Sequence, residues 1–133
     1  NEYLPHNHVK NSVVYPGTHD NTTITAWWES AATPKEKATA AAYLHLTGAH
    51  PTAKELAAVK TADARTALLR AALGSVADRA IIPMYDWLGL GEEAHLNTPG
   101  KLGGNWAWRA AAGFESKTLA KTIADECSVY CRV

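Results

Sequence analysis

The sequence is poor in the residues that mark secreted and metal-dependent proteins. It contains only two cysteines, Cys127 and Cys131, in a chain of 133 residues. They lie four positions apart near the carboxyl end, and we interpret them as reduced thiols packed on one helix face rather than as a disulfide or metal pair. His6 and His8 are a second possible pair of metal ligands, but no carboxylate or cysteine lies at a useful spacing from them. We therefore expect no metal and no other cofactor, and cysteine use this low is typical of a cytoplasmic protein.

Net charge and long apolar runs are also missing. The 13 basic and 13 acidic side chains balance, so the sequence carries no electrostatic signature of nucleic-acid binding or of an anionic membrane surface. No apolar run approaches the roughly 20 residues that span a bilayer. We therefore expect neither a nucleic-acid nor a membrane partner. The first residue, Asn1, is no natural start, so we expect the chain to be a piece of a longer protein.

The stretch at 13–21 has the pattern of a short buried strand that stops at Pro16-Gly17 and is followed by His19 and Asp20. Barrel enzymes place polar groups of this kind at the carboxyl ends of their strands. A carboxylate beside an imidazole suits binding of a polyhydroxylated ligand or stabilisation of positive charge. The competing interpretation is that Asp20 caps the helix that follows.

Hydrophobic periodicity predicts strands at 12–15 and 80–85, a short helix at 22–30, a helical block at 34–74 and a last amphipathic helix at 116–132. This order of strand, helices, strand and helix is a βαβα pattern. Trp27 and Trp28 carry large apolar area, and packing against the fold is favoured over sugar stacking for at least one of them.

Helix starts are predicted with particular clarity in the middle block. Thr33 with Glu36, and Thr52 with Glu55, have the spacing of capping boxes. In the first of these helices the Ala-rich segment is predicted to run to about Thr47, ended by Gly48.

Pro83 counts against a central strand at 80–85, because proline cannot donate to the strand ladder. Asp86 lies just past this segment and either serves a site or caps the following turn, and capping is favoured. The segment at 89–104 is rich in Gly, Asn and Pro and predicts an ordered, functional loop, in which Asn97 offers an amide suited to sugar hydroxyls.

Three strings in order carry a resemblance to a known family. They are Gly-Thr-His-Asp-Asn at 17–21, Asn-Thr-Pro-Gly at 97–100 and Asn-Trp-Ala-Trp-Arg at 105–109. With shorter matches they resemble the last third of the 4-alpha-glucanotransferases (amylomaltase or disproportionating enzyme, glycoside hydrolase family 77). The resemblance runs from about Tyr3 to about Arg132.

The resemblance implies an α/β fold: the C-terminal part of a TIM (β/α)8 barrel with a helical insertion, mostly helical in this fragment. Residues 1–133 would form the C-terminal portion of one catalytic barrel domain, with the insertion at 34–74 and the terminal helix at 116–132. Two strand-helix units cannot close an eight-stranded barrel.

The implied activity is transfer of a segment of an α-1,4-glucan (a maltodextrin, or a part of starch or glycogen) to a new acceptor by a retaining covalent mechanism. Asp20 matches a carboxylate that stabilises the transition state, and His19 and Asn97 match substrate-binding residues. The nucleophile and the acid/base lie outside this chain, so the fragment itself is expected to be inactive. A plant source would imply a plastid. Further possible substrate contacts are Trp106, Trp108 and Arg109.

Two departures from the family pattern stand out. Thr22 follows His-Asp-Asn where an acidic residue is common, and His95-Leu96 precedes Asn97 where Arg-Met is common. These differences put fine substrate preference in question, not the class of reaction. The alternatives to a transferase are an amylase-like α-glucan hydrolase and a non-catalytic carbohydrate-binding or structural module.

Overall fold

The computed structural model describes residues 1–132 and contains two short parallel strands, β1 (Val13–Val14) and β2 (Arg79–Ala80). Val13 lies opposite Arg79 and Val14 opposite Ala80, and the N–H of Ile81 donates to the carbonyl of Val14 at 2.9 Å. Both strands are shorter than predicted. The strand prediction for 80–85 is wrong beyond Ala80, because Pro83 ends the extended segment and starts helix α5 (Met84–Leu88).

A short helix that widens in its second half follows the His-Asp loop. It begins as α1 (Ile24–Ala26), with the Thr23 side chain accepting from the N–H of Ala26 at 3.1 Å, and continues as the π-helical turn η2 (Trp27–Ala31). Trp28 is 4% exposed and packs with Ala41 and Ala64, while Trp27 lies against the same cluster. The prediction that at least one of the two tryptophans packs in the fold is confirmed by Trp28.

Three helices form the middle block: α2 (Pro34–Tyr43), α3 (Ala53–Ala58) and α4 (Thr61–Leu73). Both predicted capping boxes are present at the starts of α2 and α3. The predicted end of α2 is wrong, because the helix stops at Tyr43. His45 takes the left-handed conformation (φ 58°) and the N–H of Leu46 reaches back to the carbonyl of Ala41, so the turn closes before Gly48.

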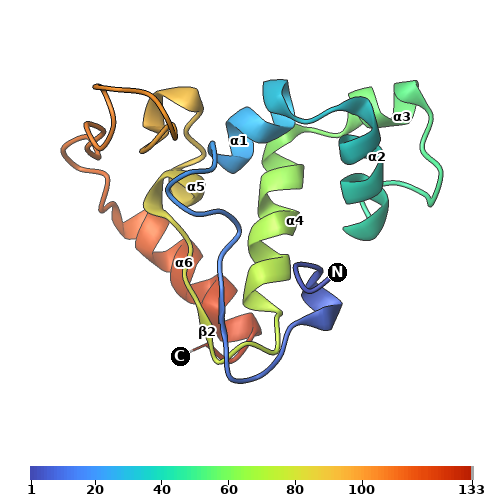
Figure 1. The fold of residues 1–133 in the computed structure, drawn as a ribbon. Coiled ribbons are helices and arrows are strands. Elements are labelled where there is room, and N and C mark those ends of the chain that lie inside the picture. Colours follow the sequence, from blue (N-terminus) through green and yellow to red (C-terminus); the bar gives the residue numbers. More distant parts are fainter. Residues whose placement is uncertain (133) are drawn as a thin grey trace.

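Helix α4 runs through the middle of the molecule, with α2 and α3 to one side and α5 and α6 (Lys117–Val129) to the other (Figure 1). It contacts α1 at one end and α6 toward its other end, where Arg70 pairs with Glu126 (Figure 1). Past α6, the guanidinium of Arg132 donates to the carbonyls of Leu73, Ser75 and Ala77, which ties the end of the described chain to the end of α4. Two short 3-10 turns, η1 (Pro5–Asn7) and η3 (Glu92–Ala94), complete the elements of residues 1–132.

Among residues 1–132 no helix is long and apolar enough to cross a membrane. The observed architecture is a mostly helical chain around two parallel strands. The loop with His19 and Asp20 directly follows β1, and the loop with Asn97 follows β2 after the short helix α5.

Candidate functional site

The loop after β1 is held in shape by its own side chains. The Oδ1 atom of Asn21 accepts from the N–H of Thr18 at 2.9 Å and from its hydroxyl at 3.0 Å. This closed turn presents His19 and Asp20 at its surface, where their side chains are about half exposed, at 50% and 47%. Asp20 makes none of the hydrogen bonds that cap α1, since Thr23 does this, so the capping interpretation of Asp20 is wrong.

The predicted loop at 89–104 reaches back to that turn at two points. The side-chain amide of Asn97 donates to Oδ1 of Asp20 at 2.5 Å, and its backbone N–H donates to the carbonyl of His19 at 3.1 Å. His19 Nε2 lies 3.4 Å from the same Oδ1 atom. Three residues that the sequence nominated from distant positions therefore meet at one point. Within residues 1–132 no hydrogen bond reaches the second oxygen of Asp20, Oδ2, so it is free to accept from a ligand.

Trp106 forms one wall beside this cluster. Its ring centroid lies 4.9 Å from that of His19, and 53% of the residue is exposed. The backbone of Trp106 has a φ of 61°, in the left-handed region that large side chains rarely adopt, and its N–H donates to the carbonyl of Leu96 at 2.6 Å. An exposed aromatic ring held at a conformational cost is a common property of functional positions.

Trp108 and Arg109 have a different place. The Trp108 ring packs edge-on against Tyr85 with the centroids 5.9 Å apart, and the Arg109 guanidinium donates to the carbonyls of Trp106 and Trp108. These contacts hold Trp108 and Arg109 against Tyr85 and against the backbone of their own loop. Of the three possible substrate contacts, Trp106 is the one whose ring packs beside His19.

Asp86 caps a helix, but a different one from that predicted. Its Oδ1 atom accepts from the backbone N–H of Ile24, the first residue of α1, at 2.9 Å, and the residue is 2% exposed. Burial raises the pKa of Asp86 to about 6, opposed by the Ile24 hydrogen bond and by the positive charge of Arg65. Asp86 is therefore a buried structural carboxyl that anchors the helix following the His-Asp loop.

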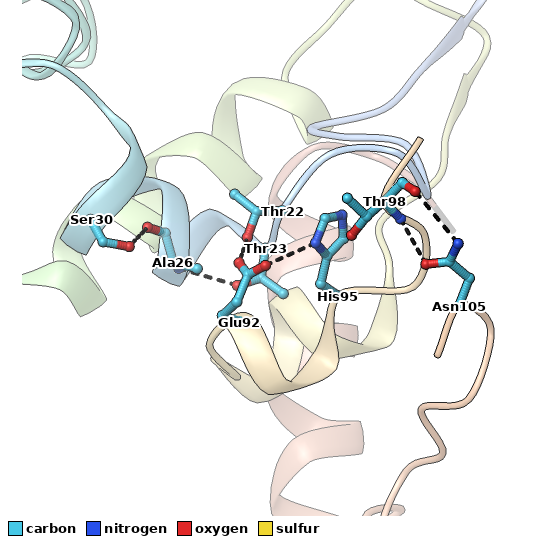
Figure 2. A network of polar contacts seen from close by, with 8 residues as sticks. All are labelled: Thr22, Thr23, Ala26, Ser30, Glu92, His95, Thr98 and Asn105. Carbon is cyan, nitrogen blue, oxygen red and sulfur yellow. Dashed lines mark hydrogen bonds and ion pairs between the residues drawn. The ribbon is translucent and has the colours of Figure 1, made fainter. Parts of the chain in front are cut away.

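A second polar cluster joins the two loops. Glu92 on η3 accepts from the hydroxyl of Thr22 with one carboxylate oxygen and contacts Nδ1 of His95 at 2.9 Å with the other (Figure 2). The pKa of Glu92 is lowered below its usual value. The hydrogen bond from Thr22 is the main cause, and His95 contributes further. Sequence reasoning did not find Glu92, although both of its partners are the departures from the family pattern noted above.

An open hollow of about 450 Å³ lies beside His19. Tyr15, Ile81, Tyr85 and Leu96 line it together with residues 17–19 of the His-Asp turn. His19 joins this hollow to the polar cluster, where a carboxylate, an imidazole, an amide and an exposed indole can hold a sugar by hydrogen bonds and ring stacking. Within residues 1–132 no group of three or more His, Cys, Asp or Glu side chains is placed to hold a metal ion. His6 and His8 therefore belong to no such group.

Comparison with known proteins shows the family of this chain. Residues 1–115 match the sequence profile of the glycoside hydrolase family 77, described as 4-alpha-glucanotransferase, and the chain belongs to this family. All of this chain aligns with the chloroplastic/amyloplastic 4-alpha-glucanotransferase of Arabidopsis thaliana at 40% identity, and the alignment covers 21% of that protein. It is 37% identical to the 4-alpha-glucanotransferase of Clostridium butyricum, covering 99% of this chain and 25% of that one.

The fold also matches a solved structure of the family. Amylomaltase from Streptococcus agalactiae in complex with acarbose superposes with a TM-score of 0.79 at 28% identity, over 97% of this chain and 23% of that one. The chain thus spans between a fifth and a quarter of the length of these relatives, and it corresponds to one part of the amylomaltase fold.

Proposed function

We propose that this chain is the C-terminal part of a catalytic (β/α)8 barrel that works as a 4-alpha-glucanotransferase. In this proposal residues 34–74 are the helical insertion and 116–132 the terminal helix. Such an enzyme breaks an α-1,4 bond, holds the donor as a covalent glycosyl intermediate and transfers it to another glucan. The observation that carries the proposal is the meeting of Asp20, His19 and Asn97 at the carboxyl end of β1 in a chain of this family.

Asp20 is proposed as the carboxylate that stabilises the transition state. The sugar ring gains positive, oxocarbenium-like charge as the bond breaks, and a nearby carboxylate stabilises that charge. Its free Oδ2 atom and its exposure leave room for a sugar hydroxyl, while Asn97 and His19 orient it through Oδ1. The nucleophile and the acid/base are supplied from outside these residues, so this chain alone binds glucan at best.

His19, Asn97 and Trp106 are proposed as glucan-binding residues. The imidazole and the amide hydrogen-bond hydroxyl groups, and the Trp106 indole stacks on a sugar face beside the His19 ring. That the related Streptococcus agalactiae amylomaltase binds acarbose, an α-glucan analogue, supports an α-glucan as the ligand. Trp108 and Arg109 contribute by holding the Trp106 backbone.

The test uses the intact protein that carries this chain, incubated with maltotriose. Glucose together with products longer than maltotriose is expected from the wild type. Asp20→Asn keeps the shape and removes the charge, and it should lower transfer at least about 1,000-fold because transition-state electrostatics is commonly the largest catalytic contribution. Asp78→Asn is the matched control, since Asp78 pairs with Lys10 at the surface and should leave transfer unchanged.

The other outcomes distinguish the alternatives. Maltose and glucose without longer products would identify an amylase-like hydrolase. A folded, intact protein that binds maltotriose without converting it would identify a carbohydrate-binding module.

A further inference from the structure

Glu92 bridges the two loops of the candidate site. Its two carboxylate oxygens contact side chains from different segments: Oε2 accepts from the Thr22 hydroxyl, and Oε1 lies 2.9 Å from Nδ1 of His95 (Figure 2). Thr22 belongs to the His-Asp loop, and His95 begins the segment that carries Asn97. One carboxylate on the short turn η3 therefore joins both.

The bridge lies at matched positions relative to the contact between Asp20 and Asn97. Thr22 is two residues after Asp20, and His95 is two residues before Asn97. The side-chain bond from Asn97 to Asp20 is one tie between the loops, and the bond from the Asn97 N–H to the His19 carbonyl is a second. The Glu92 bridge is a third tie between the same two chain segments.

The geometry also assigns a tautomer to His95. A carboxylate oxygen only accepts, so Nδ1 of the neutral ring carries the hydrogen that points at Glu92. Nε2 is then an unprotonated lone pair, and within residues 1–132 no donor reaches this buried atom. Buried N–H groups without a partner are rarer in folded proteins than buried acceptors without one. The burial of Nε2 therefore favours the tautomer that makes the bond to Glu92, and it holds the ring with 14% of its side chain exposed.

We propose that Glu92 is a positioning residue, which sets the register of the Asn97 segment against the His-Asp loop and thereby the placement of Asn97 on Asp20. This inference rests on the proposed function for its effect on transfer. Glu92 need not touch the glucan. If the Glu92 bridge is lost, the side-chain amide of Asn97 can shift relative to Asp20. A displacement of about 1 Å at a reacting group lowers rates by up to about 100-fold.

The experiment compares Glu92→Ala with Glu93→Ala in the intact protein. Glu93 is the matched control because it is the neighbouring glutamate on the same turn, and its one hydrogen-bond donor among residues 1–132 is the nearby N–H of Gly91. Glu92→Ala should lower kcat for maltotriose disproportionation about tenfold with KM within about twofold, because Asp20 acts mainly in the transition state. Glu93→Ala should leave both constants within about twofold of wild type. Glu92→Gln retains one acceptor oxygen and should fall between Glu92→Ala and wild type.

A double-mutant cycle separates positioning from a general loss of stability. If Glu92 acts through Asn97, then Glu92→Ala should change kcat by less than about twofold in an Asn97→Ala background. A full tenfold loss in that background, or an unchanged kcat in the single variant, would overturn the proposal.

Hydrogen exchange at the Asn97 amide gives a readout that needs no activity. Glu92→Ala should speed exchange of a peptide spanning 96–106 at least about fivefold, while Glu93→Ala leaves it unchanged, because only the former loosens the segment whose N–H bonds His19. Exchange at the wild-type rate in Glu92→Ala would contradict the positioning role even in a protein that shows no transfer. Absence of transfer in the wild type with faster exchange in Glu92→Ala would instead contradict the proposed function alone.

Discussion

The carboxyl group of Asp86 accepts a hydrogen bond from the backbone N–H of Ile24 at 2.9 Å, across 62 positions in the sequence. Ile24 is the first residue of α1, and the loop immediately before it carries His19 and Asp20. A side chain that follows β2 therefore anchors the chain that follows β1. Because Asp86 is buried, its ionisation is linked to the stability of this junction.

The raised pKa of Asp86 predicts a definite pH dependence of stability. The ordinary value of 3.8 rises to about 6 in the folded protein, so the folded state holds this proton more tightly than the unfolded chain. The contribution of Asp86 to stability should therefore fall as the pH rises from about 4 to about 6 and then level off, by up to about 3 kcal/mol in total. Thermal unfolding of wild type and Asp86→Asn between pH 4 and 8 checks this, since the variant lacks the titrating group.

Asp86→Asn keeps the oxygen that accepts from Ile24 and does not ionise. The unfolding free energy of the variant relative to wild type should therefore increase as the pH rises from about 4 to about 6. Asp86→Ala leaves the Ile24 N–H buried without its acceptor and should be about 1–3 kcal/mol less stable than Asp86→Asn at every pH, because neither variant titrates at this position. A wild-type profile parallel to that of Asp86→Asn would show that Asp86 does not titrate in this range.

Gly89 at the end of α5 is predicted to resist substitution for two separable reasons. It has a φ of 70°, and a Cβ atom added there would lie 1.8 Å from Nη1 of Arg65. Gly89→Ala should lose about 1–2 kcal/mol from the left-handed conformation alone, and the guanidinium must also move away. Since the charge of Arg65 lowers the pKa of Asp86, that pKa should rise further in Gly89→Ala.

Two other glycines are controls for this substitution. Gly100 has a φ of 79° with open space around it, so Gly100→Ala measures the backbone strain without a clash. Gly48 has open space and no positive φ, so Gly48→Ala should be neutral within about 0.5 kcal/mol. The loss of unfolding free energy should increase in the order Gly48→Ala, Gly100→Ala, Gly89→Ala. Equal losses at Gly89 and Gly100 would show that the clash with Arg65 costs nothing.

Substitution of Trp106 should separate stability from glucan binding. Trp106→Gly removes the ring from a residue at φ 61° and relieves backbone strain, so the melting temperature should stay level or rise. The KM for maltotriose should rise about tenfold, because stacking of an aromatic ring contributes on the order of 1 kcal/mol or more. Trp106→Phe keeps an aromatic ring, so its KM should lie between those of wild type and Trp106→Gly. An unchanged KM in Trp106→Gly would remove this residue from the proposed binding site.

Features set by neighbouring residues were predictable from the sequence. The capping boxes at Thr33 and Thr52 close within four residues, so their spacing alone reveals them. The end of α2 was not predictable in the same way, because His45 rather than Gly48 adopts the left-handed turn. The sequence pattern of 80–85 likewise did not reveal that Met84 and Tyr85 begin a helix behind Pro83.

The sequence by itself determined the family, the nomination of His19, Asp20 and Asn97, and the capped starts of α2 and α3, because long motifs and local hydrogen bonds are written in consecutive residues. Only the tertiary structure decided that Asn97 meets Asp20, that Asp86 caps α1 rather than its own turn, and that Glu92 bridges Thr22 and His95. Each of these is a hydrogen bond between residues more than 60 positions apart, or depends on one. The partner of such a bond is selected by how the chain packs, and no spacing rule along the sequence specifies it.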